Sequence, residues 1–434
     1  MKWLLWAGLL LAISLVFGFG LLAYAMYALL ATLLVSRWLA RTWTHNLSAL
    51  RECNRTTANV GDIVAVVITI QNAGWLPVAW TLVEDLLPRR ALMFEPPNLR
   101  IVGRRERLVS LASHGRSTML YQLQCNRRGF YQVGPLIMET GDLFGLHRRF
   151  QVASQPHFVM VYPKVVQLAG FEIASRRPLG EIRMSHRLFE DPTRIAGVRR
   201  YEAGDPLNRV HWRATARTGQ LHSKVYEPSS VAGVTVALDF HTAAHDPKHE
   251  PFRSELAITA AASLANAVYE MGQQVGLASN CRDAADRIRT EGWDYDLRSR
   301  SAARRVAGML EASDRLRPVV VETRQGSEQL LRILAVLARA ELSDGLTFAQ
   351  LLSEPSCRLR HDATVVALLT QVTPETAIAL GNLRRRGHAV AVLLNLYDGW
   401  QFGELAGALA AEGITAHHLK DEAAIPEICR QFLY

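Results

Sequence analysis

An uncharged apolar run at the N-terminus constrains this chain more than any other feature of its sequence. No charged residue stands between Trp3 and Ser36, with Lys2 before the run and Arg37 and Arg41 after it. A single helix of that length would rise about 51 Å at 1.5 Å per residue, whereas the hydrocarbon core of a bilayer is about 30 Å thick. One straight span is therefore too long unless the helix tilts or protrudes.

Gly18-Phe19-Gly20 lies at the middle of this run and offers a break. The two halves, Trp3–Phe17 and Leu21–Ser36, would each be about 22–24 Å long, which a locally thinned bilayer tolerates. Basic residues then flank both outer ends, and the positive-inside rule places both ends in the cytoplasm. We therefore predict a transmembrane helical hairpin, with the bulk of the chain cytoplasmic.

Two alternatives to the hairpin stay open. One is a single long span, and the other is a signal peptide cleaved at Ala23-Tyr24-Ala25, which has the A-x-A pattern. The apolar run before that pattern is longer than an h-region and continues past it, which disfavours cleavage.

Composition excludes several classes of protein. Of the 434 residues, 49% are apolar and 21% are charged, which is ordinary globular usage and excludes a disordered, collagen-like or disulfide-dense chain. The net charge of +9 favours an anionic surface, such as inner-leaflet lipid, nucleic acid or an acidic partner. The cysteines are odd in number and dispersed, which favours a reducing compartment: Cys53, Cys125, Cys281, Cys357 and Cys429.

Residues 47–155 have the pattern of a β domain. Ile63–Ile70 is a β-branched run and Ser117–Cys125 alternates, so short turn-bounded strands predict an antiparallel β-sandwich. Further strands are predicted at Val78–Val83, Phe130–Val133 and Leu136–Glu139. The glycine-containing segments Arg127–Tyr131 and Gly141–Leu146 are most simply turns.

A basic segment follows, with eleven Lys or Arg but five Asp or Glu between Arg176 and Lys224. Val198–Tyr201 and Leu221–Tyr226 are predicted strands. Val210–Ala216 between them is helical or irregular, and Gly219 ends it.

The chemistry of this segment leaves three interpretations open. Its arginines suit phosphate or carboxylate groups, and its aromatic rings suit stacking on nucleic-acid bases. Alternatively, the arginines pair with Glu202 and Asp205 in a network between domains, or dock a protein, since Trp and Arg are enriched at binding hot spots. We favour docking or a structural network formed by Arg199, Tyr201, Gly204, Asp205, Arg209, His211, Trp212, Arg217 and Gly219.

The pattern R-x-Y-x-x-G-D-x-x-x-R-x-H-W-x-A-x-A-R-T-G, from Arg199 to Gly219, resembles the signature of the DUF58 family. Arg127–Tyr131 and Gly141–Leu146 resemble further elements of that family, and the resemblance covers nearly the whole chain. It implies an N-terminal apolar hairpin in the bacterial inner membrane, a β region, this block and a von Willebrand A-like domain. It also implies partnership with MoxR-type AAA+ ATPases, encoded often beside membrane-bound transglutaminase-like proteins, and no established enzymatic activity.

The C-terminal region alternates apolar strands with helices, which predicts a mostly parallel, doubly wound sheet. The strands are predicted at Gly233–Phe240, Gln274–Ala278, Thr364–Leu369 and Ala389–Leu396. The helices are predicted at Arg253–Met271, Ser301–Ser313, Ser327–Leu342, Pro374–Arg386 and Phe402–Glu412. Ligands of such sheets bind at the carboxyl ends of strands, which marks the loops after Asp239 and Leu369.

A metal site is not expected at Asp239. Metal-binding von Willebrand A domains carry D-x-S-x-S there, whereas Asp239-Phe-His241-Thr-Ala243 keeps only the first Asp, and Thr370-Gln371-Val372 lacks an expected later Asp. A neighbouring set of possible ligands is predicted to be a solvated loop, because Pro247 interrupts any helix: His241, His245, Asp246, His249 and Glu250. No Walker A sequence or Gly-rich phosphate loop appears, so the chain itself is not expected to hydrolyse ATP. No G-x-S-x-G elbow appears either, and no cofactor is expected.

We thus predict a transmembrane hairpin at 1–40, a β-sandwich-like domain at 41–160, the basic signature segment at 161–230 and a von Willebrand A-like α/β domain at 231–434. The predicted function is that of a non-enzymatic membrane adaptor or assembly factor for a MoxR-type ATPase, in contact with the bilayer, with cell-envelope processes as the predicted setting. The alternatives are a ligand- or nucleotide-binding enzyme that uses Asp239 with the Arg/His/Trp cluster, and a nucleic-acid-binding protein whose affinity falls steeply with salt.

Overall fold

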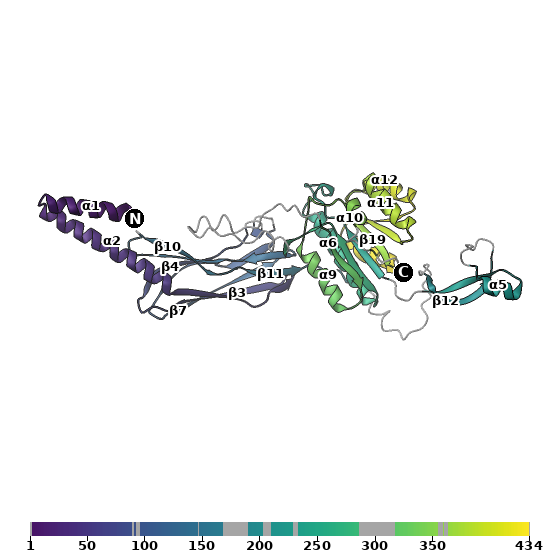
Figure 1. Cartoon of the computed structure of the whole chain (residues 1–434), viewed down its shortest axis with the longest axis horizontal. Coiled ribbons are helices and arrows are strands. Elements are labelled where there is room, and N and C mark those ends of the chain that lie inside the picture. Colours follow the sequence, from purple (N-terminus) through teal and green to yellow (C-terminus); the bar gives the residue numbers. More distant parts are fainter. Residues whose placement is uncertain are drawn as a thin grey trace. The chain divides into compact units, whose positions relative to one another are not determined.

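The computed structural model describes residues 2–88, 91–92, 96–145, 147–167, 190–202, 210–228, 233–285, 317–354, 359 and 363–433 (Figure 1). The chain divides into two compact units. The N-terminal unit comprises residues 1–162 with 284–312, and the C-terminal unit comprises 163–283 with 313–434. The predicted helix at Ser301–Ser313 lies outside the described residues.

Two apolar helices open the N-terminal unit. Helix α1 (Lys2–Val16) and helix α2 (Gly20–Asn46) are separated at Gly18, whose φ of +70° lies in the region that favours glycine. The helical run therefore breaks where the sequence predicted. Helix α2 is the described helix long and apolar enough to cross a membrane, and a signal sequence meets the same criterion.

Helix α2 extends beyond the apolar run and enters the β domain. Ser36, Ala40 and Trp43 are buried at a spacing of three to four residues, which places them on one helix face. Trp43 belongs to the core of the β domain, and the Ser36 Oγ hydrogen-bonds to the Nδ1 of His147 at 2.9 Å. The helix is thus packed into the domain that follows it.

The β domain confirms the predicted antiparallel strands. One sheet has the order β1-β3-β7-β5, and a second has the order β10-β9-β4-β6. The strands of the first are Leu47–Cys53, Ile63–Asn72, Arg116–Cys125 and Leu99–Gly103, in that spatial order. Those of the second are Arg148–Ser154, Leu136–Gly141, Val78–Asp85 and Glu106–Leu111. A third sheet, β2-β11-β8, comprises Thr57–Asn59, His157–Tyr162 and Gly129–Val133.

Alternation along the strands produces the core of this unit. In β3, Val64, Val66, Ile68 and Ile70 are buried while the residues between them are not. They share one apolar cluster with side chains of the second sheet, such as Val83 and Met138. The two sheets therefore bury a common core, as a sandwich requires.

A buried ion pair crosses this core. The Nη1 of Arg51 lies 2.6 Å from the Oδ1 of Asp85, and both side chains are fully buried. The hydroxyl of Tyr121 donates to the Oδ2 of Asp85 at 2.7 Å, and Arg51 also donates to the carbonyl of Gln155. Gly134 has a φ of +99° and leaves room for the guanidinium, which a Cβ would overlap.

The C-terminal unit contains a mixed sheet with helices on both faces (Figure 1). Its strand order is β17-β15-β14-β19-β20-β21, and every neighbouring pair is parallel except β15 with β17. The strands are Val319–Arg324, Gln274–Ser279, Gly233–Leu238, Ala363–Leu369, Val390–Leu394 and Thr415–His418, in that spatial order. The mostly parallel sheet is confirmed, but its antiparallel edge strand β17 was not predicted.

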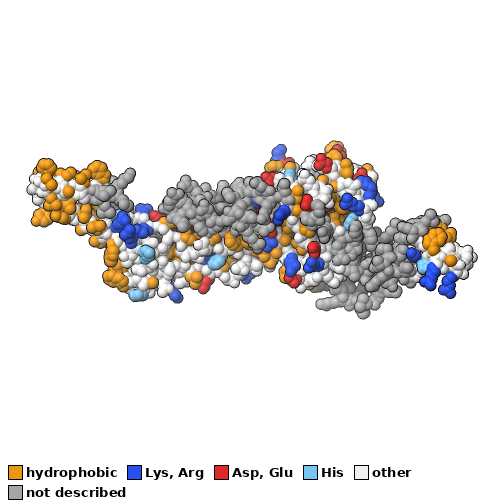
Figure 2. Space-filling model, in the orientation of Figure 1, with side chains coloured by type: hydrophobic (Ala, Val, Ile, Leu, Met, Phe, Trp, Pro, Cys, Tyr) orange, Lys and Arg blue, Asp and Glu red, His pale blue; other side chains and the backbone are white. Residues whose placement is uncertain are grey.

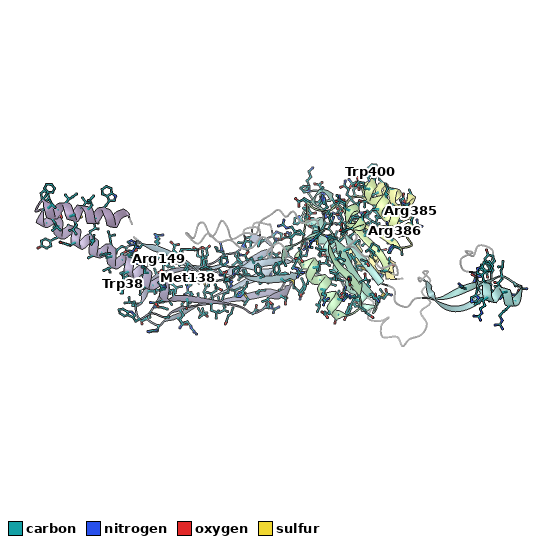
Figure 3. The ribbon with its side chains drawn as sticks, viewed as in Figure 1. Trp38, Met138, Arg149, Arg385, Arg386 and Trp400 are labelled. Carbon is teal, nitrogen blue, oxygen red and sulfur yellow. The ribbon has the colours of Figure 1, made fainter. Side chains whose placement is uncertain are left out.

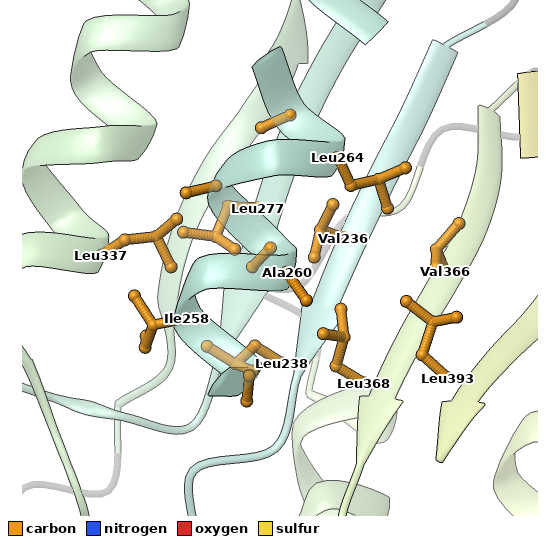
Figure 4. Close-up of a cluster of buried hydrophobic side chains, with 14 of the residues drawn as sticks. Val236, Leu238, Ile258, Ala260, Leu264, Leu277, Leu337, Val366, Leu368 and Leu393 are labelled. Carbon is orange, nitrogen blue, oxygen red and sulfur yellow. The ribbon is translucent and has the colours of Figure 1, made fainter. Parts of the chain in front are cut away.

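Successive residues of the central strands pack on opposite helical layers. On one face, Val236 and Leu238 pack with helices α6 (Phe252–Glu270), α9 (Ser327–Arg339) and α13 (Ile425–Leu433) (Figure 4). On the other face, Ala237 packs with helices α10 (Phe348–Ser353), α11 (Pro374–Arg385) and α12 (Gly399–Ala411). This three-layer arrangement is that of an α/β protein.

Candidate functional site

The signature segment forms a two-stranded sheet with a short helix. Strand β12 (Glu190–Arg200) pairs antiparallel with β13 (His222–Pro228), and helix α5 (Trp212–Thr218) lies between them in sequence. These three elements, with the described residues that join them, are here named the arm. The strand–helix–strand order is the one that the sequence predicted.

Two signature residues terminate helix α5. His211 is its N-cap, and the imidazole Nδ1 accepts a hydrogen bond from the backbone N–H of Ala214 at 3.0 Å. Gly219 ends the helix with a φ of +72°, and its N–H donates to the carbonyl of Thr215 at 2.9 Å. The Thr215 hydroxyl accepts from the N–H of His222 at 3.1 Å and so joins helix to strand. Both signature residues therefore shape the arm.

The helix presents its remaining side chains to solvent. None of the residues of α5 is buried, and Trp212 is 68% exposed. Val198 and Leu221 are further large exposed apolar side chains of the arm. Arg213 and Arg217 are exposed on α5, so apolar and basic groups share this surface (Figure 2).

Of the predicted arginine network, the described residues include the pair of Arg199 with Glu202. Arg199 lies 3.4 Å from Glu202, and both side chains are exposed, so this pair contributes little to stability. The Tyr201 N–H donates to the carbonyl of Leu221 at 2.9 Å. Three further predicted site residues lie outside the described residues: Gly204, Asp205 and Arg209.

A second candidate site lies at the carboxyl end of β14. This strand is flanked by β15 and β19, where the strand order changes direction, and ligands of doubly wound sheets bind at such points. Asp239 follows β14 and is 5% exposed. Its Oδ1 accepts from the Nδ2 of Asn280 at 2.9 Å and from the N–H of His241 at 3.2 Å.

Asn280 is the residue of this site that the sequence analysis missed. Its Oδ1 accepts from the N–H of Phe240 at 2.6 Å. The amide of Asn280 therefore binds both the Asp239 carboxyl and the backbone of the next residue. Burial raises the pKa of Asp239, and the hydrogen bond from Asn280 acts in the opposite direction. The position of Asn280, directly after the neighbouring strand β15, is the signal that marks it.

The histidine-rich loop is largely exposed, as the sequence predicted, with Asp246 and His249 among its exposed residues, but His245 departs from that prediction. His245 is 4% exposed, its Nδ1 lies 2.8 Å from the Oε1 of Glu250, and its ring packs edge-on against Phe240. His249 stacks on Tyr397, while His241 caps a short 3-10 turn. His245 is buried because its ring packs against Phe240, directly after β14, with its Nε2 3.4 Å from the carbonyl oxygen of Asp239. Among the described residues, no group of three or more His, Cys, Asp or Glu is arranged to hold a metal ion.

The two candidate sites do not share a hydrogen-bond network among the described residues. Asp239 bonds to Asn280 and His241, whereas the hydrogen bonds described for Arg199, His211 and Thr218 stay within the arm. The arm exposes the side chains of Trp212, Arg213 and Arg217. The Asp239 site contains a buried carboxyl that joins the segment after β14 to Asn280, directly after β15.

We expect Asp239→Asn to leave the fold intact, because an amide oxygen accepts the same two hydrogen bonds. A native pKa raised above the ordinary Asp value of about 3.9 means that the folded state binds this proton more tightly than the unfolded state. The stability of the wild type relative to the variant should therefore fall as pH rises through the native pKa. Thermal unfolding of both proteins in detergent, at a series of acidic to neutral pH values, measures this difference. A difference that grows in favour of the wild type with rising pH contradicts it.

Comparisons with known proteins place the arm within a family model. The model described as "Protein of unknown function DUF58" matches residues 197–294, which contain most of the arm, β14, α6 and β15. The chain is also similar to the "Uncharacterized protein YeaD" of Bacillus subtilis (strain 168), with 26% identity over 257 residues. That similarity covers 59% of this chain and 61% of the relative, which is less than two thirds of the relative's length.

Two solved structures to which the chain is similar each match 26% of it. The CARDB domain of PF1109 from Pyrococcus furiosus is 14% identical, with a TM-score of 0.19, over 26% of this chain and 91% of that domain. A PapD-like domain of human CEP192 is 16% identical, with a TM-score of 0.16, over 26% of this chain and 82% of that domain. Similarity at this level does not define a fold or a function.

Proposed function

We propose that this chain is a non-enzymatic, membrane-anchored docking protein whose arm binds a MoxR-type AAA+ ATPase. The observation that carries the proposal is the exposure of Trp212 on a helix that buries none of its side chains. Tryptophan and arginine are the residues most enriched at binding hot spots. The partner class comes from the resemblance of Arg199–Gly219 to the DUF58 signature.

The architecture of the arm supports a docking role. A two-stranded sheet is marginally stable in water by itself, and β12 with β13 forms such a sheet. Exposed Val198, Trp212 and Leu221 add apolar surface that a partner would cover. The arginines beside them favour an acidic partner surface and accelerate its encounter.

We further infer that the C-terminal unit is a von Willebrand A-like domain without a metal. In its strand order, β14 is the first strand and lies at the centre, which corresponds to the doubly wound order 3-2-1-4-5-6. Asp239 stands directly after that strand, as the resemblance implies. Its carboxyl is engaged by Asn280 and by backbone, which supports a role in ordering the loops.

The N-terminal helices support a membrane anchor in this proposal. Lys2 precedes α1, and Arg37 and Arg41 follow the apolar part of α2, so positive charge flanks a two-span hairpin on one side. The packing of Ser36, Ala40 and Trp43 into the β domain supports an anchor rather than a cleaved signal. The proposed location is the bacterial inner membrane, with the bulk of the chain in the cytoplasm.

Titration of the detergent-solubilised chain with the MoxR-type ATPase of the same host tests the docking proposal. Saturable binding that depends on a non-hydrolysable ATP analogue is the expected result. Absence of binding in every nucleotide state contradicts the proposal. Binding of single-stranded nucleic acid, with affinity that falls steeply with salt, would instead support the nucleic-acid alternative.

A further inference from the structure

The loop after β9 presents two large apolar side chains to solvent. Leu143 and Phe144 are 63% and 68% exposed. The loop that carries them is rigidly built, because the buried carboxylate of Asp142 accepts from the N–H of Phe144 at 3.0 Å and from the N–H of His147 at 2.6 Å. The Trp80 indole N–H also donates to the Asp142 carbonyl at 3.1 Å. The two apolar side chains are therefore held outward by a defined turn.

This loop lies against the apolar part of helix α2. The Ser36–His147 hydrogen bond ties its base to the helix, and a groove of about 280 Å³ separates its tip from α2. The groove is lined by Leu143 and Phe144 on one side and by α2 residues from Ala31 to Leu39 on the other. The tip thus lies alongside the last two turns of the apolar run.

The length of the apolar run predicts where the loop lies relative to the hydrocarbon core of a bilayer. From Gly20 to Ser36, helix α2 rises about 25 Å, close to the thickness of about 30 Å of a hydrocarbon core. Ser36 therefore marks the edge of that core when α2 crosses a bilayer. The groove runs along α2 from Leu39, outside the apolar run, to Ala31, inside it. Leu143 and Phe144 therefore lie at the edge of the hydrocarbon core and beside its outermost part.

A cluster of arginines lies at the same level. Arg37 and Arg41 follow the apolar run of α2, and Arg149 of β10 lies near both. Partial burial and the like charges of Arg41 and Arg37 lower the pKa of Arg149, so the cluster is a concentrated positive patch. Figure 2 shows basic side chains where the apolar helix meets the β sheets, and Figure 3 labels Trp38 and Arg149 in this region.

We infer that this surface is a second membrane contact, in which Leu143 and Phe144 insert beside α2 and the arginine cluster binds the phosphates of anionic phospholipids. Aromatic and apolar tips are stable at the boundary between headgroups and acyl chains, and exposed Trp38 belongs to the same belt. Basic side chains near an anionic leaflet add favourable energy. The inference rests on the proposal that α2 crosses the bilayer, and it fixes how the β domain meets the surface.

Photo-crosslinking of the full chain in nanodiscs tests the insertion. The discs contain equal amounts of phosphatidylglycerol and phosphatidylcholine, and p-benzoylphenylalanine replaces Phe144, Leu29 or Leu108 in separate variants. Leu29 of α2 is the reference for the membrane span, and Leu108 is an exposed control in β6, at the opposite edge of the sheet from β10. We expect phospholipid adducts, read by mass spectrometry, at positions 29 and 144 but not at 108.

The outcomes separate this inference from the anchor proposal. An adduct at 29 without one at 144 overturns the inference and leaves the anchor standing, and equal adducts at 144 and 108 overturn it as well. Absence of adducts at both 29 and 144 contradicts the anchor itself.

The lipid preference tests the arginine cluster. We expect adducts at 144 to be enriched in phosphatidylglycerol. The triple variant Arg37→Gln/Arg41→Gln/Arg149→Gln should lose that enrichment, because each arginine increases the affinity for an anionic lipid by about a factor of five. Arg55→Gln, which changes an exposed arginine elsewhere in the unit, is the matched control. Unchanged enrichment in the triple variant overturns the phosphate-binding part of the inference.

Discussion

Replacing Trp212 by alanine is expected to weaken binding of the MoxR-type ATPase by about 30-fold or more. Central tryptophans of interfaces commonly contribute at least about 2 kcal/mol, and 1.4 kcal/mol corresponds to tenfold in affinity. The variant should remain folded, because α5 is capped by His211 and Gly219 and Trp212 is 68% exposed. Equilibrium titration of the full chain against the ATPase measures the change.

Trp400→Ala is the matched control for this prediction. Trp400 is 76% exposed on α12 of the same unit, so its removal deletes an exposed indole of similar area outside the arm (Figure 3). We expect its affinity to equal that of the wild type. Equal losses in both variants would show that neither effect is specific to the arm, and an unchanged affinity in Trp212→Ala would remove the arm from the interface.

Replacing Arg51 by methionine is expected to destabilise the N-terminal unit by about 3–5 kcal/mol, because it leaves the carboxylate of Asp85 buried without its positive partner. Tyr121 still donates one hydrogen bond to that carboxylate, but a neutral hydroxyl does not balance its charge. Thermal unfolding of the full chain in detergent, followed by tryptophan fluorescence, measures the loss.

Two further variants test whether the loss of stability comes from the unpaired buried charge. Arg51→Met/Asp85→Leu removes both charges and should recover much of the loss, since apolar replacement of a buried pair is often neutral. Arg55→Met breaks an exposed pair with Asp62 and should cost about 1 kcal/mol or less. A double variant as unstable as Arg51→Met would show that the packing of the arginine, rather than its charge, stabilises the unit.

Strands and helices with a clear burial period were predictable from the sequence. Ile63–Ile70 became β3 and Arg253–Met271 became α6 within two residues at each end, because burial of one face requires the period that the apolar residues show. The end of the N-terminal helix was not found. Ala40 and Trp43 stay in phase with Ser36 and pack into the β domain, so the helix continues past the charged residues to Asn46.

The features that sequence reasoning missed depend on contacts distant in the chain. Strand β17 gains its antiparallel direction only by pairing with β15, and its short sequence shows no alternation. Asn280 has the identity of a turn residue, and its role exists only because β14 and β15 are adjacent. Gly219 was predicted from the sequence to end the segment before it and does end α5, whereas the contribution of His211 as the N-cap required the geometry.

Hydrogen exchange of the arm tests the central claim most directly. A two-stranded sheet with an exposed helix should exchange its backbone amides rapidly in the free protein, because few buried contacts protect them. With the MoxR-type ATPase and a non-hydrolysable ATP analogue bound, we expect exchange in α5 and β13 to slow by about tenfold or more, while exchange in α12 is unchanged. An ATPase that binds the chain and leaves the exchange of α5 and β13 as it was contradicts the account.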